Sequence, residues 1–325
     1  MLYVEVGLLT NYSRYYQTPT TFLIMAQSVW TAPDQSFTKT VIKEGKDFKR
    51  PNEGSTCHIK IDVSSEEMKH ESLFGYQINI ETKIILGTGK GELSSIIDGA
   101  LETMRKGESC RVEISPDSLK DINIEDQRSH SESEPPSNAG KVSSCHVDIH
   151  LNTFERSPDV HELNLKQRVE RMRNYKTFGS ECFRSGKIDL AERFYIRALK
   201  YAILTNRFIN EKEEFKEVVE KFWDINNLCL LNLAACQLRY NRYEDVITNC
   251  TKAIVIDDTN PKGFFRRGQA HMALQDYELA QEDFKNGLKL DPNSKTLQEQ
   301  LKIVQGKIQD LEKGYAQNMK KLFQD

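Results

Sequence analysis

The sequence lacks any C-x-x-C pair, any H-E-x-x-H motif and any apolar run of the ~18 to 20 residues that a membrane helix needs. Proline and glycine are scarce, with 9 and 17 residues among 325, which excludes collagen-like and low-complexity chains. Neither charge sign dominates, because 45 basic residues face 48 acidic ones and the formal net charge is −3. We therefore expect no nucleic-acid partner and no membrane partner.

Cysteines are also too few and too scattered for a disulfide framework. The seven are Cys57, Cys110, Cys145, Cys182, Cys229, Cys236 and Cys250. An odd number without regular spacing fits reduced thiols, so we expect a protein of the cytoplasm, or of cytoplasm and nucleus. The segment 1–24 holds one acid and one base and lacks the basic stretch of a secretory signal. Because Met25 is an alternative start, we treat residues 1–28 as an N-terminal extension without predicted structure.

Residues 29–156 have the pattern of a small α+β domain. Alternation with period two predicts strands at 57–63, 76–80, 110–114 and 144–151. Between Leu93 and Met104 the apolar spacing becomes helical, and Gly107 follows as a stop signal. One short helix among antiparallel strands indicates the α+β class. The polar, turn-rich residues 117–141 predict a long surface loop.

Residues 157–325 contain an internal repeat. Three sets of positions share one register: Gly179, Ala234 and Gly268; Ala191, Val246 and Ala280; Ala198, Ala253 and Gly287. In every set the second and third members are separated by about 34 residues, the helix–turn–helix period of a tetratricopeptide solenoid. The first and second members are separated by that period plus an insertion of about 21 residues. We place the repeats at about 172–205, 227–260 and 261–294, and expect the insertion near 205–220 to lengthen the helices beside it.

After the third repeat, residues 295–323 predict one amphipathic helix. Its apolar stripe consists of Leu297, Leu301, Val304, Ile308, Leu311, Tyr315, Met319 and Leu322. Stacked repeats need a terminal element that covers the last apolar face. We therefore predict that this stripe caps the solenoid.

Several segments resemble the large FKBP-type immunophilins, which join an FKBP domain to tetratricopeptide repeats. The helical half carries the resemblance in residues 232–236, 261–268 and 276–280. The first half carries it in Glu44-Gly45, Gly54 to Cys57, Leu86-Gly87, Met104 to Gly107 and Ile114 to Asp117. A divergent vertebrate branch of the family shares the pattern Trp30 to Phe37 and the tail Tyr315 to Phe323. The resemblance implies an FKBP-like antiparallel sheet at 29–156 and an all-α domain at 157–325.

The resemblance also implies a prolyl isomerase pocket with aromatic walls, and the residues depart from it. The pocket positions align with Ile61, Thr82, Ile97 and Lys120. Residues 41–150 contain only Phe48, Phe74 and Tyr76 as aromatic residues, too few for such a pocket. We therefore expect a protein that is not an enzyme, with an active isomerase as the alternative.

Two further motifs have simpler explanations. Gly87 to Gly91 resembles a phosphate-binding loop but lacks the G-K-[ST] ending, so a strand-to-helix turn is expected there. His146, Asp148 and His150 share one face of a strand, and without further ligands they predict a solvated face rather than a metal site. We expect neither a cofactor nor a metal.

The repeat register gathers polar residues on the first helices of the repeats. Lys176, Ser180, Asn232, Lys262 and Arg266 lie at positions two, five, six and nine of their repeats, which form one stripe. We call these five the clamp residues. Three cations and an amide in one groove favour carboxylate ligands.

In the family that the chain resembles, these positions grip the C-terminal Glu-Glu-Val-Asp of heat-shock protein 90, and Ser180 replaces the usual asparagine. The resemblance implies a non-catalytic co-chaperone that links the chaperone to clients, with steroid-receptor complexes among them. An isomerase tethered to the chaperone stays open as an alternative. So does a repeat scaffold for another acidic or phosphorylated peptide.

Overall fold

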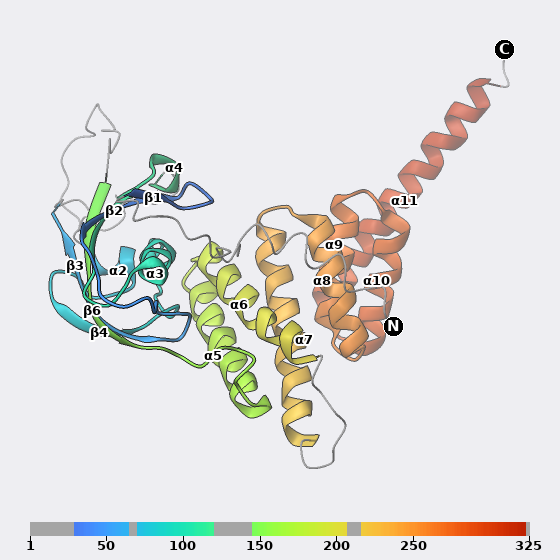
Figure 1. Cartoon of the computed structure of the whole chain (residues 1–325). Coiled ribbons are helices and arrows are strands. Elements are labelled where there is room, and N and C mark those ends of the chain that lie inside the picture. The colour runs from blue at the N-terminus through green and yellow to red at the C-terminus, as the bar shows by residue number, and fades with distance from the viewer. Residues whose placement is uncertain (1–28, 65–69, 120–144, 207–215, 323–325) are drawn as a thin grey trace, which may run out of the picture. The chain divides into compact units, whose positions relative to one another are not determined.

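The computed structural model describes residues 29–64, 70–119, 145–206 and 216–322 (Figure 1). The chain divides after Ser157 into two compact units, which are treated separately below. The N-terminal extension, Lys120, most of the predicted loop at 117–141 and part of the insertion near 205–220 lie outside the described residues.

In the first unit, the described residues form a six-stranded antiparallel sheet and three short helices. Its strands are β1 (Val29–Thr31), β2 (Phe37–Lys43), β3 (Thr56–Val63), β4 (Glu81–Ile85), β5 (Ser109–Ile114) and β6 (Cys145–Glu155), in the order β1-β2-β5-β6-β3-β4. The helices are α2 (Glu71–Phe74), α3 (Ser94–Thr103) and α4 (Pro116–Leu119). The α+β class is confirmed.

Alternate residues of the strands form the core of this unit. Ile61 pairs with Ile149, which pairs with Cys110, and all three side chains are fully buried. Ile96 and Ile97 of α3 belong to the same apolar cluster. The strands predicted at 57–63, 110–114 and 144–151 are confirmed because period two fits a sheet with one covered face.

The strand predicted at 76–80 is wrong, since β4 begins only at Glu81. Asn79 adopts φ of 60°, and its side-chain oxygen accepts a hydrogen bond from Val63 N at 2.9 Å. Tyr76 and Ile78 are nevertheless buried, so an irregular segment places alternate side chains in the core and imitates a strand. The expected single helix is also corrected, because α2 and α4 span four residues each, too few to show a period.

Where the structure describes the second unit, its helices form three successive pairs followed by a long final helix. The bounds are α5 (Leu165–Arg184), α6 (Ile188–Asn206), α7 (Lys216–Arg239), α8 (Tyr243–Ile256), α9 (Pro261–Ala273), α10 (Tyr277–Leu290) and α11 (Lys295–Leu322). The helical repeat region is confirmed. The helices beside the insertion, α6 and α7, have 19 and 24 residues, whereas α9 and α10 have 13 and 14.

Equivalent contacts hold the two helices together in the first and third repeats. A Cβ atom added at Gly179 would lie 2.7 Å from Cε1 of Tyr195, and one at Gly268 would lie 2.6 Å from Cε1 of Phe284. Only glycine lets the aromatic ring lie directly on the neighbouring helix. The repeat register therefore predicts real structural equivalence.

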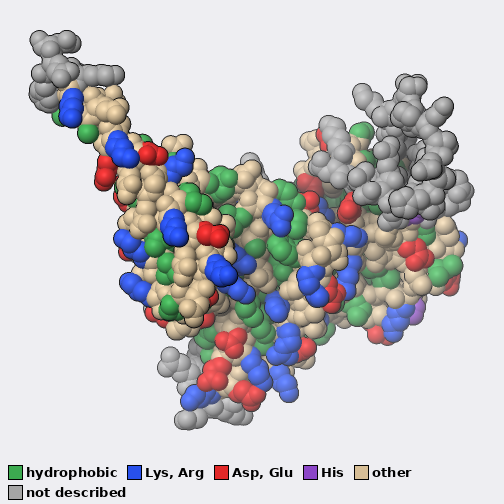
Figure 2. Space-filling model, turned by 180° about the vertical axis from the view of Figure 1, so that it is seen from behind, with side chains coloured by type: hydrophobic (Ala, Val, Ile, Leu, Met, Phe, Trp, Pro, Cys, Tyr) green, Lys and Arg blue, Asp and Glu red, His purple; other side chains and the backbone are tan. Residues whose placement is uncertain are grey.

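The predicted cap is confirmed only for the first half of α11. Leu297 and Val304 are buried against the last repeat, but Leu311, Tyr315 and Met319 are 43%, 69% and 52% exposed. At 1.5 Å per residue, the 28 residues of α11 extend about 42 Å, twice the length of α10, which it covers. The stripe therefore continues past its support, and apolar side chains stay visible along α11 (Figure 2). None of the described helices is long and apolar enough to span a membrane.

Candidate peptide-binding groove

The first helices of the repeats lie side by side, because α7 packs against both α5 and α9. The clamp residues come from these three helices: Lys176 and Ser180 from α5, Asn232 from α7, and Lys262 and Arg266 from α9. Each pair on one helix is four residues apart and shares a face.

The hydroxyl of Tyr195 in α6 contacts two of the clamp residues. Tyr195 is 1% exposed, and its hydroxyl donates a hydrogen bond to Ser180 Oγ at 3.3 Å and also bonds the Asn232 side chain. Burial raises the pKa of Tyr195 to about 12, so the hydroxyl stays neutral at physiological pH. The sequence analysis gave no role to this hydroxyl. The difference between Tyr195 and Phe284 in equivalent positions is the signal that could have revealed it.

Ser180 differs chemically from the amide expected at its position. Its Oγ donates to the backbone oxygen of Lys176 at 2.9 Å, one turn earlier on α5. A hydroxyl has one proton, so in this arrangement Ser180 presents only acceptor sites to a ligand. Donors to a carboxylate must come from the other clamp residues.

Arg266 fixes the opposite side of the groove. Its Nη1 donates to the backbone oxygen of Leu231 at 2.6 Å, directly before Asn232 in α7. Burial lowers the pKa of Arg266, and the neighbouring Tyr195 and Cys250 groups oppose that shift. The guanidinium stays charged, since arginine side chains are effectively always protonated in proteins. A positive charge is thereby held against α7, at the residue before Asn232.

The two lysines differ in their surroundings. Lys176 is half-buried and lies near Cys229 of α7. Burial raises the pKa of the Cys229 thiol to about 12, and the positive charge of Lys176 opposes that shift. Lys262 is exposed in the first turn of α9, where Asn260 caps its backbone N–H at 3.1 Å. Among the described residues, no carboxylate pairs with Lys176, Lys262 or Arg266.

The structure thus brings Ser180, Asn232 and Arg266 together around Tyr195, with Lys176 beside α7. Among the described residues, none forms a hydrogen bond or ion pair with the side chain of Lys262. The neighbouring Arg267 is not part of this group, since it binds Asp283 through two nitrogens, one of them at 2.7 Å.

Arg266 also borders a cavity of about 460 Å³ that the sequence analysis did not predict. Its lining residues are Phe183, Ala235, Leu238, Arg239, Tyr243, Arg266, Gln269 and Ala273. They come mainly from the inner faces of α5, α7 and α9, so the groove continues beyond the clamp residues. A peptide held at Arg266 has space there for a further side chain.

In the first unit, the aligned pocket positions contribute to the core or the surface. Ile61 and Ile97 are fully buried, and Thr82 donates to the Gln77 side chain at 3.2 Å. Phe74 belongs to the core and Phe48 is 93% exposed.

The candidate metal ligands have other partners or lie in the open. Asp148 forms an ion pair with Arg111 at 2.8 Å, which lowers the pKa of that carboxyl. Asp159, His161 and Glu162 bring ligand atoms within 4.8 Å, but Glu162 accepts a hydrogen bond from the backbone of Asp159 at 2.8 Å. This hydrogen bond closes a local turn, and the turn explains why the three side chains lie close together.

Known proteins are similar to this chain in one or both of its units. A family model described as tetratricopeptide repeat matches residues 261–294. The peptidyl-prolyl cis-trans isomerase FKBP4 of Homo sapiens is 28% identical over 277 residues, 85% of this chain and 55% of that protein. The FK506-binding protein-like of Homo sapiens is 26% identical over 310 residues, 92% of this chain and 74% of that protein.

Among solved structures, a multi-domain immunophilin from Arabidopsis thaliana is 22% identical with a TM-score of 0.35. The similarity covers 79% of this chain and 95% of that one. The chain spans about half the length of human FKBP4.

Proposed function

Because the chain is a homologue of the FKBP4-type immunophilins and carries a tetratricopeptide repeat, we propose that it is a non-catalytic co-chaperone. Its groove binds the acidic C-terminal tail of heat-shock protein 90, and the first unit links the chaperone to client proteins. Steroid-receptor complexes are the clients that the resemblance implies.

The observation that carries the proposal is the arrangement of the clamp residues. Arg266 is half-buried next to Asn232, Lys176 lies beside α7, and no described carboxylate neutralises either cation. Cations that are partly removed from water and unpaired gain most from a carboxylate ligand. A chain terminus that ends in aspartate supplies two carboxylates within a few ångströms.

The individual residues have distinct roles in this proposal. Arg266 and the Asn232 amide donate to one carboxylate, while Lys176 supplies a charge on the opposite helix. Ser180 contributes least, because its proton is already bonded to the Lys176 carbonyl. Lys262 attracts the acidic tail from the exposed start of α9.

Calorimetry with a peptide that ends in Glu-Glu-Val-Asp tests the proposal on the full chain. We expect Arg266→Ala to cost roughly 1.5 to 3 kcal/mol, a tenfold to hundredfold loss of affinity, because a charge-assisted hydrogen bond is removed. Lys262→Ala should cost less, since water screens an exposed cation. Lys285→Ala on α10 is the control, because its ammonium bonds Gln281 on the outer helix.

Amidation of the peptide terminus should weaken binding as much as Arg266→Ala. Equal affinity for the free and amidated peptides would contradict a carboxylate clamp. The groove would then be a scaffold that binds internal acidic or phosphorylated segments. The non-catalytic role and the cytoplasmic or nuclear location are part of the same proposal. Seven free cysteines, all buried, agree with a reducing compartment.

A further inference from the structure

A basic surface lies on the first unit, at residues to which the proposed function assigns no role. It consists of Lys43, Lys46, Lys49, Arg50, Arg105 and Lys106, with Phe48 among them. The fold brings its two segments together, because Lys46 N donates to the backbone oxygen of Lys106 at 2.7 Å. Gly45 lies so close to Arg105 that an added Cβ would be 2.6 Å from the Arg105 Cβ.

The positive charges of this basic surface are not neutralised by acidic groups in the described part of the protein. None of the six forms an ion pair with another described residue, and five of them are exposed. Glu44 and Asp47 are the acids in the same segment, so positive charge remains in excess. A cluster of unpaired cations costs stability through mutual repulsion unless an anionic partner binds it.

Phe48 adds an apolar contact to this charge. Its ring is 93% exposed, and the Arg105 guanidinium lies 5.9 Å from the ring centroid. The arginine holds the ring in place without covering it. An aromatic ring left in water among cations is typical of the centre of a binding surface.

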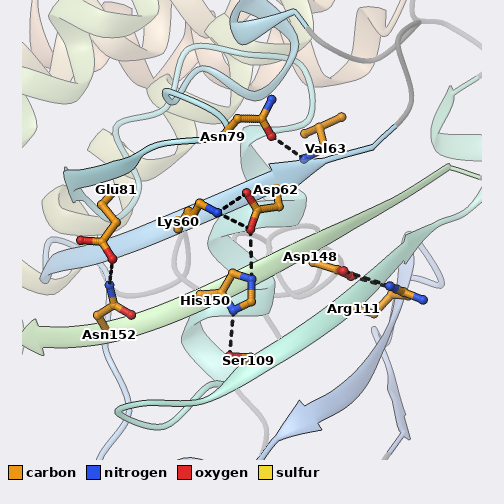
Figure 3. A network of polar contacts seen from close by, with 10 residues as sticks. All are labelled: Lys60, Asp62, Val63, Asn79, Glu81, Ser109, Arg111, Asp148, His150 and Asn152. Carbon is orange, nitrogen blue, oxygen red and sulfur yellow. Dashed lines mark hydrogen bonds and ion pairs between the residues drawn. The ribbon is translucent and has the colours of Figure 1, made fainter.

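A polar cavity of about 400 Å³ adjoins the basic surface at Lys43. One row of paired residues crosses five strands there: Lys43 with Ser109, Ser109 with His150, His150 with Lys60, and Lys60 with Glu81. Figure 3 shows the last four of these side chains on one face of the sheet.

The three carboxylates near this row all have partners. Glu108, which also lines the cavity, pairs with Lys39 at 2.8 Å. Asp62 pairs with Lys60 at 2.8 Å and with His150 at 3.2 Å, and Glu81 accepts from Asn152 at 3.2 Å. Lys43 is the cation of the cavity that has no described partner. The cavity therefore offers an unpaired charge to an acidic side chain.

We propose that the basic surface binds an extended acidic peptide segment that carries an apolar residue. Its carboxylates pair with the exposed lysines, one acidic side chain enters the cavity at Lys43, and the apolar residue packs on Phe48. The cavity favours a peptide over an anionic membrane, because a bilayer surface does not fill a pocket. Glu44 and Asp47 would also repel anionic headgroups, whereas a peptide can place its charges between them.

Titration of the full chain with a fluorescent, C-terminally amidated peptide, Glu-Glu-Trp-Glu-Glu-Glu-Glu, tests the proposal. Lys46→Glu/Lys49→Glu/Lys106→Glu should weaken binding more than tenfold, and Phe48→Ala should weaken it about threefold. Phe48 is nearly fully exposed, so its replacement leaves the fold unchanged. The control is Lys302→Glu/Lys307→Glu/Lys313→Glu on α11, which changes net charge equally at exposed positions and should leave affinity unchanged.

Arg266→Ala separates this surface from the groove. It should leave the affinity for the amidated peptide unchanged, whereas a loss would assign binding to the groove and overturn the proposal. If the α11 control weakened peptide binding as much as the triple variant of the basic surface, net charge alone would explain the loss of affinity. That result would also overturn the proposal. Binding to phosphatidylserine vesicles that the triple variant abolishes, without binding of the peptide, would assign the surface to a membrane instead.

Discussion

At the scale of single residues, one hydroxyl distinguishes the groove from a plain packing contact. Tyr195 and Phe284 hold the same place in their repeats, and each ring lies on a glycine of the first helix. The register predicts both rings but cannot predict that the Tyr195 hydroxyl bonds Ser180 and Asn232. That contact depends on the helix crossing, which only the assembled solenoid defines.

Tyr195→Phe tests this hydroxyl while the ring stays in place. We expect affinity for a peptide ending in Glu-Glu-Val-Asp to fall roughly 2- to 12-fold, because one hydrogen bond worth about 0.5 to 1.5 kcal/mol no longer positions the Asn232 amide. Tyr201→Phe is the matched control: Tyr201 is also buried in α6, and its hydroxyl accepts from Arg171. Equal losses in both variants, measured by calorimetry, would mean that the effect is general loosening of α6.

At the scale of secondary-structure elements, the glycine–aromatic contacts determine how closely helices approach. An alanine at 268 would place its Cβ 2.6 Å from Phe284, closer than any real contact, so ring or helix must move. Such overpacking in a core typically costs about 1 to 3 kcal/mol. We expect Gly268→Ala to lower the urea midpoint of the helical circular dichroism signal.

Gly306→Ala on α11 is the control for helix propensity. No atom lies within 4 Å of the added methyl group, so alanine should leave stability unchanged or raise it by up to about 1 kcal/mol. If both substitutions stabilise the protein, the close approach of α9 to Phe284 is wrong.

Local patterns predicted the elements whose period matches their burial. The repeat register located the helix pairs, and alternation located β3, β5 and β6. The segment at 76–80 imitates a strand in the sequence because Tyr76 and Ile78 are buried without a β ladder. The stripe of α11 predicts a complete cap because a sequence shows an apolar face but not that α10, the helix beneath it, is half as long.

At the scale of the whole molecule, two units with separate cores divide the proposed work. The helical unit carries the clamp residues, and the repeat register predicts their common stripe, but it cannot show that Arg266 donates to the backbone of α7. The first unit carries the basic surface, which no sequence period indicates, because residues 43–50 and 105–106 come together only through the sheet. Its core is mainly aliphatic around α3, with Ile61 and Ile97 fully buried.

That aliphatic core leads to a prediction for the whole chain. An isomerase pocket needs aromatic walls that exclude water from the twisted amide, and the three aromatic residues between 41 and 150 are placed otherwise. Phe74 is buried in the core, the Tyr76 hydroxyl donates to Asp98 at 2.6 Å, and Phe48 is exposed. We expect the full chain to leave proline isomerisation of a model peptide at its uncatalysed rate, tens to hundreds of seconds. Human FKBP4 in the same assay is the positive control, and acceleration that rises with protein concentration and disappears with a macrolide pocket ligand would establish an active isomerase.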